Sequence, residues 1–423
     1  MTQQNRKSDF VTPPRSEALR ILAERGFIKD CTDLAVLDQR LVDGKVTAYA
    51  GFDATADSLH VGHLLPLMAL RWLEKCGHEP IVLLGGGTSE VGDPSLRKDS
   101  RPLLEQHQIA ANISGMSQSI EQLFDFDDNA VRLLNNAEWL KEFQFLDFLR
   151  EFGPHFTVNR MLTFETVKNR LEAHLPLTVL EFCYMMLQAV DFIELSKRYD
   201  CSLQIGGSDQ WGNIVNGVEL GRRTDRSLIG LTVPLLTTAS GAKMGKTAAG
   251  AVWLNPERLS PFGLWQFFRN VADADVTKLL KLFTERPMPE IARIDTLEGA
   301  DLNDAKIMLA SDVTRLIHGD DQSKAAERQG AALFSDGTIA SEPTHVVPIE
   351  LLAQGFGLLE LMTQIEFSSS NSEARRLIQG GGVRLNGQVI EDEKRRILEG
   401  DLSAGDQLVL AIGRRRKALV AFR

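Results

Sequence analysis

The sequence has few cysteines, and it has no apolar run long enough to cross a membrane. Its four cysteines are far apart and form no Cys-x-x-Cys pair, which argues against a zinc cluster of the usual spacing. Scattered reduced thiols are expected instead. A membrane-spanning helix needs about 20 apolar residues, and the polar N-terminus is followed by no apolar stretch of the signal-peptide type. We therefore expect a cytoplasmic protein with no membrane partner.

The chain also has no overall excess of basic residues. Its formal net charge of −10 argues against non-specific binding of DNA or other nucleic acid over the whole surface. Residues 358–423 differ, because they hold 11 Lys and Arg against 9 Asp and Glu. Several of these cations are adjacent, as in Arg414-Arg415-Arg416-Lys417. A locally basic module on an acidic chain predicts selective contact with a polyanion, although a solvated surface explains this composition equally well.

Short apolar segments alternate with amphipathic ones over the first 240 residues. Apolar strands are expected at 46–52 and 80–84, with a helix at 63–75 between them, so this unit should form a parallel pair with a right-handed crossover. Further strands are expected at 131–135, 202–206 and 231–236, and helices notably at 138–150 and 179–198. The pattern predicts an α/β fold with a doubly wound, Rossmann-type parallel sheet.

The chain is expected to contain three domains and a linker. Residues 1–240 form the Rossmann-type domain, with a helical insertion near 120–180, and residues 241–335 form a loop followed by an α-helical domain. Residues 336–357 contain the Pro and Gly spacing of a linker. Residues 358–423 form a small α+β domain, with a helix to Gln379 that Asn371 or Ser372 caps and a hairpin turn at Asn386-Gly387.

The connection between the first strand and the first helix carries two histidines. In an open α/β sheet, such a connection faces the ligand crevice. His60 and His63 would lie at the start of the helix, beside free backbone N–H groups that suit a phosphate. Imidazole N–H groups can donate to an oxyanion, and Gly62 leaves room for a nucleotide. The same spacing is also compatible with a surface pair or with metal ligands.

Two further loops follow strands. Residues 85–95 are rich in glycine but lack the Gly-Lys-Ser/Thr of a P-loop, and Arg97 and Arg101 after them are either phosphate ligands or solvated charges. Residues 204–213 contain Gly207, which would let a sugar come close, and Asp209, which is either an acceptor for ribose hydroxyls or a helix cap.

A fourth segment contains two lysines on a glycine-containing loop. Lys243 and Lys246 would make a mobile cationic clamp suited to pyrophosphate leaving a nucleotide. Taken alone, the pair is better explained as solvated surface lysines.

Together and in this order, these segments resemble the class I aminoacyl-tRNA synthetases. Residues 60–63, His-Val-Gly-His, are similar to the family's His-Ile-Gly-His signature, and residues 243–247, Lys-Met-Gly-Lys-Thr, to its Lys-Met-Ser-Lys-Ser loop. Residues 49–60, 92–95, 184–192 and 204–213 resemble the bacterial tyrosyl branch. The segment from about 358 is similar to a small RNA-binding fold shared with a ribosomal small-subunit protein.

The resemblance implies a ligase that activates L-tyrosine with ATP and transfers it to tRNA(Tyr). It also implies Mg²⁺ carried by ATP, with no dedicated metal site in the protein, and a homodimer formed through helices around 138–195. The residues implied to bind tyrosine are Tyr49, Asp93, Tyr184, Gln188, Asp191 and Gln210. Those implied to line ATP are Gly51, Asp53, Gly62, Gly207, Asp209, Lys246 and Thr247. Those implied to stabilise the pyrophosphate are Thr55, His60, His63, Lys243, Lys246, Arg97 and Arg101.

Asp191 supports this interpretation on physical grounds. It lies on an apolar helix between Val190 and Phe192, and an unpaired buried carboxylate is costly. A phenol hydroxyl would provide a partner, so phenylalanine should be rejected. Only three tyrosines occur in the chain, and two of them, Tyr49 and Tyr184, fall in the implied pocket. The alternative for Tyr49 is a core aromatic on a strand.

Some positions depart from the commoner family pattern, and two other functions stay open. The departures are Pro66, Ser89, Glu90, Val190 and Gly245.

Tryptophan in place of tyrosine is one alternative function, which the Tyr49/Asp191 pair disfavours. A non-catalytic RNA-binding relative is the other, which the intact histidine and lysine pairs disfavour.

Overall fold

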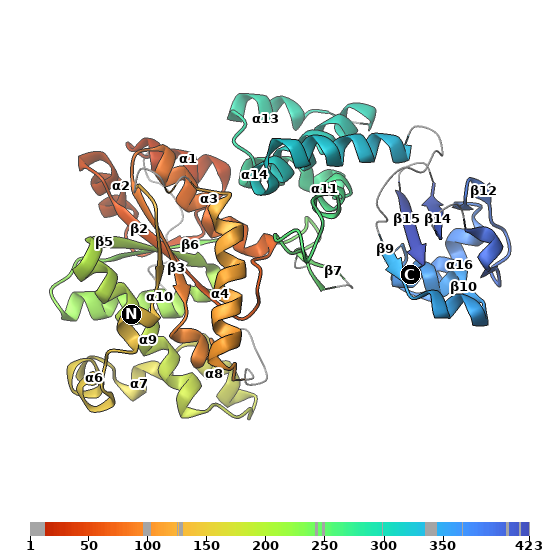
Figure 1. Cartoon of the computed structure of the whole chain (residues 1–423). Helices are drawn as coiled ribbons and strands as arrows, with labels where there is room; N and C mark the ends of the chain where they lie inside the picture. The colour runs from red at the N-terminus through yellow and green to blue at the C-terminus, as the bar shows by residue number, and fades with distance from the viewer. Residues whose placement is uncertain are drawn as a thin grey trace. The chain divides into compact units, whose positions relative to one another are not determined.

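The computed structural model describes residues 13–95, 103–124, 126, 130–241, 244–247, 250–297, 299–334, 345–365, 367–402, 406–413 and 416–422. The chain divides into two compact units (Figure 1). The first comprises Met1–Gly245, Trp253–Arg258 and Thr277–Thr296, and the second Lys246–Val252, Leu259–Val276 and Leu297–Arg423. The helical domain expected at 241–335 is therefore shared between the two units. Across the described ranges, no helix has both the length and the apolar character needed to cross a bilayer.

A six-stranded sheet forms the centre of the first unit. Its strands are β1 (Asp30–Cys31), β2 (Thr47–Asp53), β3 (Glu79–Gly85), β4 (Arg132–Asn135), β5 (Cys201–Gly207) and β6 (Ile229–Val233). The strand order is β1-β6-β5-β2-β3-β4, and all neighbours are parallel except β1 and β6. The expected doubly wound sheet is confirmed. The last expected strand ends earlier than predicted, at Val233 rather than residue 236.

Helices cover both faces of this sheet (Figure 1). The helices of the first unit up to α10 are α1 (Glu17–Arg25), α2 (Leu34–Asp43), α3 (Val61–Lys75), α4 (Gln106–Glu121), α5 (Ala137–Leu140), α6 (Phe145–Glu151), α7 (Val158–Met161), α8 (Glu165–Glu172), α9 (Val179–Tyr199) and α10 (Trp211–Arg223). The single helix expected at 138–150 is two helices, α5 and α6, because the backbone is extended at Gln144, the N-cap of α6 (φ −74°, ψ 141°).

The order of the strands creates a crevice between β2 and β5. From β2 the chain proceeds outward to β3 and β4, whereas from β5 it proceeds the other way to β6. Two right-handed crossovers in opposite directions place α3 and α10 on opposite faces of the sheet. The connections after β2 and β5 therefore diverge, and ligands of doubly wound sheets bind at such a point.

Helix α9 is the longest helix of the first unit, and its first turn is held firmly. Thr178 caps it, accepting from the Glu181 N–H at 3.2 Å, while Glu181 Oε2 accepts from the Thr178 N–H at 3.1 Å. The buried guanidinium of Arg170 pairs with Glu181 at 3.0 Å. A buried charge pair with this geometry fixes the loop before α9. The same helix carries Tyr184, Gln188 and Asp191.

The second unit begins with packed helices. α11 (Pro261–Arg269) packs against α14 (Gly299–Phe334), which turns back on itself at Gly319, where φ is +83°. The hydroxyl of Ser323 donates to Ser311 O at 2.7 Å and joins the two arms of α14. Gly330 leaves space for Trp265, since a Cβ there would lie 2.4 Å from the indole ring.

A small α+β domain follows in the second unit. Its main sheet has the order β12-β11-β14-β15-β9, and only β15 and β9 pair in parallel. The strands are β9 (His345–Val347), β10 (Phe356–Gly357), β11 (Val383–Leu385), β12 (Gln388–Val389), β13 (Arg396–Ile397), β14 (Gln407–Ile412) and β15 (Arg416–Phe422), and the helices are α15 (Leu358–Gln364) and α16 (Asn371–Gln379). The hairpin turn at Asn386-Gly387 is confirmed, with φ of +48° and +84°.

Two expectations for this region were wrong. The linker was placed at 336–357, but residues 345–347 are β9, which pairs with β15 inside the domain's own sheet. Val347 and Phe356 also belong to the domain's buried core. The cap of α16 is Ser370, whose hydroxyl accepts from Glu373 N at 3.3 Å, rather than Asn371 or Ser372. Residues 335–344 lie outside the described part of the chain.

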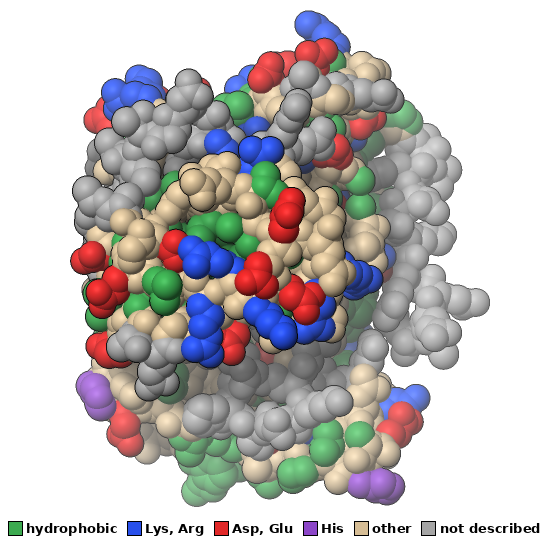
Figure 2. Space-filling model, turned by 90° about the vertical axis from the view of Figure 1, so that its right-hand side faces the viewer, with side chains coloured by type: hydrophobic (Ala, Val, Ile, Leu, Met, Phe, Trp, Pro, Cys, Tyr) green, Lys and Arg blue, Asp and Glu red, His purple; other side chains and the backbone are tan. Residues whose placement is uncertain are grey.

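The basic residues of this domain are partly engaged within it. Arg375 pairs with Glu393 at 3.3 Å, Arg395 pairs with Asp401, and the Arg416 guanidinium lies 4.9 Å from the centre of the Phe367 ring. Figure 2 shows basic and acidic side chains mixed on the face it presents. The domain therefore presents fewer uncommitted cations to a polyanion than its composition suggests.

Arg25 anchors a segment that is distant in the sequence. Its buried guanidinium donates to Lys281 O at 3.0 Å, Thr284 O at 2.8 Å and Arg286 O at 2.6 Å. These carbonyls belong to the end of α12 (Val276–Phe283) and the loop before α13 (Met288–Ile294), where a helix leaves its last carbonyls unbonded. Burial lowers the pKa of Arg25 to about 10, so the side chain stays charged at neutral pH.

Replacing Arg25 tests this anchor. We expect Arg25→Met to cost about 3 kcal/mol, because charged hydrogen bonds to several buried carbonyls are lost. Thermal unfolding should shift to lower temperature, and backbone amides of residues 277–284 should exchange hydrogen faster. Arg20→Ala on the exposed side of the same helix is the control and should change little. Unchanged exchange in Arg25→Met would contradict the assignment.

Candidate active site

The turn after β2 is fixed by side chains from several elements. Asp53 ends the strand, and its Oδ1 accepts from the Thr88 hydroxyl at 2.8 Å while its Oδ2 accepts from the Tyr184 hydroxyl at 3.0 Å. The N–H of Ala54 donates to Ser89 Oγ at 2.7 Å. The turn is therefore rigid before any ligand arrives. Ser89 thus has a clear role in the structure, whereas Glu90 forms an ion pair with Lys141.

The two histidines stack on each other at the start of α3. The ring centres of His60 and His63 lie 3.7 Å apart and the planes are within 13°. Phe52 meets His63 edge-on at 5.7 Å. A Cβ on Gly62 would lie 2.9 Å from the His60 ring, so glycine is needed for this packing. The backbone N–H of His60 donates to His63 Nδ1 at 3.4 Å, so the two rings are held together at the N-terminal end of α3, where an anion is favoured.

Both ends of the lysine-containing loop meet this histidine turn within the first unit. On the incoming side, a Cβ on Gly245 would lie 3.7 Å from Gly62 N. On the returning side, Trp253 bridges to His60 and the N–H of Leu254 donates to Leu59 O at 2.9 Å. Gly245 has φ of +93°, a conformation that favours glycine over the serine of the family signature.

Two buried polar side chains, Tyr49 of β2 and Asp191 of α9, lie near each other. Tyr49 is 1% exposed, and its hydroxyl has no hydrogen-bond partner in the described structure. Its ring meets Phe192 edge-on at 5.2 Å. Burial, followed by the nearby charge of Asp191, raises the pKa of Tyr49 well above its usual value, so its hydroxyl is protonated. An unsatisfied buried hydroxyl of this kind suits a polar ligand group.

Asp191 is also buried, and two side chains hold it. Its Oδ1 accepts from Trp139 Nε1 at 2.8 Å and its Oδ2 accepts from Asn136 Nδ2 at 2.9 Å. Burial raises the pKa of Asp191 to about 7, although both hydrogen bonds act in the opposite direction. Each carboxylate oxygen has a second lone pair, so the group can still accept from a ligand hydroxyl.

Acidic and amide groups gather near this pocket. Asp93 is 7% exposed, and its Oδ2 accepts from Gln210 Nε2 at 2.8 Å. Burial and then the charges of Asp53 and Asp93 raise the pKa of Tyr184, so Tyr184 acts as a donor to Asp53. Gln188 lies one helical turn beyond Tyr184 on α9 and is half-buried. Two carboxylates around one hydroxyl form an environment suited to an ammonium group.

Of the remaining site residues that the family resemblance implies, the structure describes some and not others. Gly207 follows β5, and a Cβ on it would lie 2.4 Å from Asp209 Oδ1, so glycine allows that carboxylate to fold inward. Gly51 and Thr55 are exposed on and after β2. Lys246 and Thr247 form β7, but their side chains lie outside the description. Arg97, Arg101 and Lys243 lie outside the described residues altogether.

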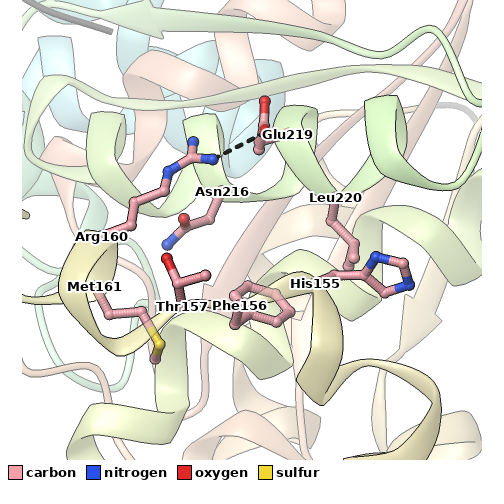
Figure 3. A pocket seen from close by; sticks show the side chains of 8 residues that line it. All are labelled: His155, Phe156, Thr157, Arg160, Met161, Asn216, Glu219 and Leu220. Carbon is pink, nitrogen blue, oxygen red and sulfur yellow. Dashed lines mark ion pairs between the residues drawn. The ribbon is translucent and has the colours of Figure 1, made fainter.

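A separate hollow lies between α7 and α10 (Figure 3). Arg160 pairs there with Glu219 at 3.1 Å. Hydrogen bonds from Arg222 above all, then from Arg223, hold the pKa of Glu219 at about 2. This hollow contains none of the residues that the sequence predicted for a ligand site, and we assign it no role in catalysis.

Sequence reasoning missed the partners of Asp191. Asn136 follows β4 and is 1% exposed, and Trp139 lies on α5 and is fully buried. Position at the carboxyl end of a parallel strand marks Asn136 as a candidate for the crevice. The sequence offers no such indication for Trp139, because a tryptophan in a short helical segment is normally interpreted as a residue of the hydrophobic core.

Comparison with known proteins agrees with this geometry. Residues 42–335 match the family model "tRNA synthetases class I (W and Y)", and residues 357–403 match the S4 domain. A tyrosine--tRNA ligase of Paracoccus denitrificans is 50% identical over 96% of this chain and 98% of that protein. One of Xanthobacter autotrophicus is 50% identical over 99% of both chains.

Solved structures show the same fold. A C-terminally truncated mitochondrial tyrosyl-tRNA synthetase of Aspergillus nidulans superimposes with a TM-score of 0.67 and 35% identity, covering 75% of this chain and 94% of that chain. A tryptophanyl-tRNA synthetase of Encephalitozoon cuniculi, at 11% identity and a TM-score of 0.53 over 73% of this chain and 87% of that chain, shares the fold alone.

The paired histidines, the returning loop and the parallel sheet define a class I aminoacyl-tRNA synthetase. Within that class, the chain belongs to the family of bacterial tyrosine–tRNA ligases, and it carries an S4 domain at its C-terminal side.

The raised pKa of Asp191 predicts a titration that can be observed at Trp139. We expect the Trp139 indole N–H resonance to move with a midpoint near pH 7 in protein labelled with ¹⁵N-tryptophan, because its acceptor changes from carboxyl to carboxylate. Trp139→Phe identifies the resonance, and Asp191→Asn should abolish the titration. A resonance that stays constant from about pH 5 to 9 would show that Asp191 does not titrate within this pH range.

The same ionisation has a stability consequence of definite sign. In the unfolded chain the carboxyl titrates at about 4, and in the folded protein at about 7. The folded state thus binds the proton more tightly, and the contribution of Asp191 to the free energy of unfolding falls as pH rises across that window.

Proposed function

We propose that the chain activates L-tyrosine with ATP, releases pyrophosphate, and transfers the tyrosyl group from the adenylate to the 3′ end of tRNA(Tyr). The observation that carries this proposal is the buried pair of Tyr49 and Asp191, which offers a phenol hydroxyl one donor and one acceptor in a dry pocket. Phenylalanine would leave the buried Tyr49 hydroxyl without a hydrogen-bond partner and would give Asp191 no further donor beyond Trp139 and Asn136.

The other groups near the pocket fit the rest of the amino acid. Asp93 and Tyr184, with Gln188, would hold the α-ammonium, and Gln210 would lie near the carboxylate. Asp93 and Gln210 are already hydrogen-bonded to each other at 2.8 Å, so the ammonium and carboxylate ends of the ligand would meet a prearranged pair. Positioning of this kind converts binding energy into alignment of the reacting carboxylate.

The nucleotide would occupy the crevice between the β2 and β5 connections. Asp53 and Asp209 would accept from the ribose, and Gly51, Gly62 and Gly207 are assigned to the nucleotide from the family resemblance. The tyrosine carboxylate then attacks the α-phosphate in line, and pyrophosphate leaves. No covalent bond to the enzyme forms, so rate enhancement comes from orientation and charge stabilisation.

Charge on the leaving pyrophosphate would be met by two sets of donors. The first is the stacked pair His60 and His63 with Thr55. The second is the lysine-containing loop with Lys243, Lys246 and Thr247, joined by Arg97 and Arg101, which we assign from the family resemblance. The attachment of both loop ends at the histidine turn supports the union of the two sets.

Magnesium would enter with ATP. This ion keeps several waters and prefers phosphate oxygens to an all-protein cage, so it would bridge phosphate groups while His60 and the lysines meet the remaining charge. Among the residues that the structure describes, no group of three or more His, Cys, Asp and Glu side chains is arranged to hold a metal.

The tRNA would be bound by the helical part of the second unit and by the S4 domain, mainly through phosphates. Because ATP and charged tRNA are used in the cytoplasm, we place the enzyme there.

Pyrophosphate exchange tests the activity. With ATP and each of the twenty amino acids in turn, we expect labelled pyrophosphate to enter ATP with tyrosine alone at a substantial rate. Exchange that depends on tryptophan would favour a tryptophan-specific enzyme of the same family. Binding of tRNA without any exchange would indicate a non-catalytic relative. Tyr49→Phe should lower the preference for tyrosine over phenylalanine by about tenfold or more.

We also propose a homodimer formed through the insertion between β4 and α9. Exposed large apolar side chains concentrate there: Phe145, Leu146, Leu149, Val158, Leu162, Leu171, Val179 and Leu180. So many exposed large apolar side chains within one segment of the chain are typical of a surface that another protein surface covers.

Light scattering tests the dimer. Wild-type protein should have twice the mass of one chain, and the double variant Phe145→Glu, Val179→Glu should have the mass of one chain, because charges replace two of the most exposed apolar side chains of the insertion. Leu103→Glu, at an exposed leucine outside the insertion, is the control and should remain dimeric. A monomeric wild type would exclude this arrangement.

A further inference from the structure

We propose that Thr88 is a positioning residue that couples recognition of the amino-acid side chain at Asp191 to the nucleotide-binding turn at Asp53. The inference rests on the proposed function and deepens it, since it names a residue through which one substrate would influence the binding of the other. Thr88 is 3% exposed and lies in a short 3₁₀ helix, Thr88–Glu90, after β3.

The hydroxyl of Thr88 lies between the two subsites. Asn136 Nδ2 donates to Thr88 Oγ1 at 3.0 Å and to Asp191 Oδ2 at 2.9 Å. Thr88 Oγ1 in turn donates to Asp53 Oδ1 at 2.8 Å. Two carboxylates that contact different parts of the substrates are therefore joined by a single amide and a single hydroxyl.

The direction of every bond in this chain is determined. The backbone N–H of Gly87 donates to Asn136 Oδ1 at 2.7 Å, and a backbone N–H can only donate. The amide oxygen of Asn136 is thus identified, and its nitrogen must face Thr88 and Asp191. Because Thr88 accepts from that nitrogen, its own proton is directed to Asp53.

Gly85 makes room for the hydrogen bond between Thr88 and Asp53. A Cβ on Gly85 would lie 2.4 Å from Asp53 Oδ1 and 2.6 Å from Thr88 Oγ1, so the bond between them occupies space that only glycine provides. In a buried chain of hydrogen bonds, a change at one end alters the polarisation and position of the next group. A ligand hydroxyl on Asp191 would therefore change the orientation of Asp53, and a ribose on Asp53 would change Asp191.

This coupling predicts a reciprocal effect between tyrosine and nucleotide. The dissociation constant of tyrosine should differ with and without a non-reacting ATP analogue, and the ratio of these two constants measures the coupling. By linkage, tyrosine should change the dissociation constant of the analogue by the same factor. Thr88→Val keeps the shape of the side chain but removes the hydroxyl, so the ratio of the two constants should collapse toward one. The rate of tyrosyl-adenylate formation should fall by about tenfold to a hundredfold. Thr88→Ser restores the hydroxyl and should recover both quantities to within about threefold.

A purely structural role for Thr88 would give a different result. Loss of packing would weaken tyrosine binding equally with and without the analogue, leaving the ratio unchanged. Thr314→Val is the matched control, because the Thr314 hydroxyl is fully buried in the helical part of the second unit and has no partner in the described structure. It should alter neither the ratio nor the rate.

The coupling can be tested independently of catalysis. In Thr88→Val, Asn136 loses an acceptor that fixes its amide, so its donation to Asp191 weakens and the pH midpoint of the Trp139 indole resonance should rise. Thr88→Ser should return the midpoint to the wild-type value. If wild-type protein forms no adenylate with tyrosine, the proposed function is wrong. The pH midpoint of the Trp139 resonance needs no substrate, so it would still show whether Thr88 acts on Asp191 through Asn136.

Three results would each overturn the proposal. The first is a wild-type protein that binds tyrosine equally well with and without the ATP analogue. The others are a Thr88→Val variant with the same ratio of tyrosine dissociation constants as wild type, and a Thr88→Val variant in which the pH midpoint of the Trp139 resonance is unchanged.

Discussion

The active site depends on the burial of the Asp191 carboxylate between the sheet and α9. A carboxylate without water is stable only when donors face it, and Trp139 and Asn136 supply them at 2.8 and 2.9 Å. These donors hold the group in place but do not use all of its lone pairs. The buried, unsatisfied hydroxyl of Tyr49 lies in the same pocket. Under the proposed function, selectivity for a phenol follows from the Tyr49 hydroxyl that an apolar ligand leaves without a partner.

The fold brings this pocket to the nucleotide crevice through the reversal of strand order. β2 carries Tyr49 in its middle and Asp53 at its end, so one strand contributes to both subsites. Helix α9 carries Tyr184 and Asp191 about two turns apart, and Tyr184 reaches back to Asp53 at 3.0 Å. The distance between side chain and carboxylate of the amino acid is thus set by two rigid elements rather than by loops.

Much of this organisation could be predicted from the sequence. The strands at 47–53, 79–85 and 201–207 were evident from short apolar runs followed by glycine-rich turns, and α9 from its helical period. The class of protein was indicated by the His-Val-Gly-His segment at 60–63 and the Lys-Met-Gly-Lys-Thr segment at 243–247, taken together and in this order. The helical character expected for the later part of 241–335 is seen in α11, α12, α13 and α14.

Other features could not be predicted, for identifiable reasons. Trp139 and Asn136 are 52 and 55 residues from Asp191, and local patterns contain no information about such contacts. β9 was assigned to a linker because a strand of three residues among prolines has no detectable period. Thr88 could be seen from the sequence to lie in a glycine-rich loop, but its partners Asp53 and Asn136 depend on how β2 and β4 align with β3.

The most direct test is a crystal structure of the full chain with a non-hydrolysable analogue of tyrosyl-adenylate. One crevice should hold the whole ligand, with the phenol oxygen about 3 Å from both Tyr49 Oη and an Asp191 carboxylate oxygen and the ribose against the Asp53 turn. A ligand bound with its phenol ring outside this pocket, or with its adenosine in a region remote from the histidine turn, would contradict the account.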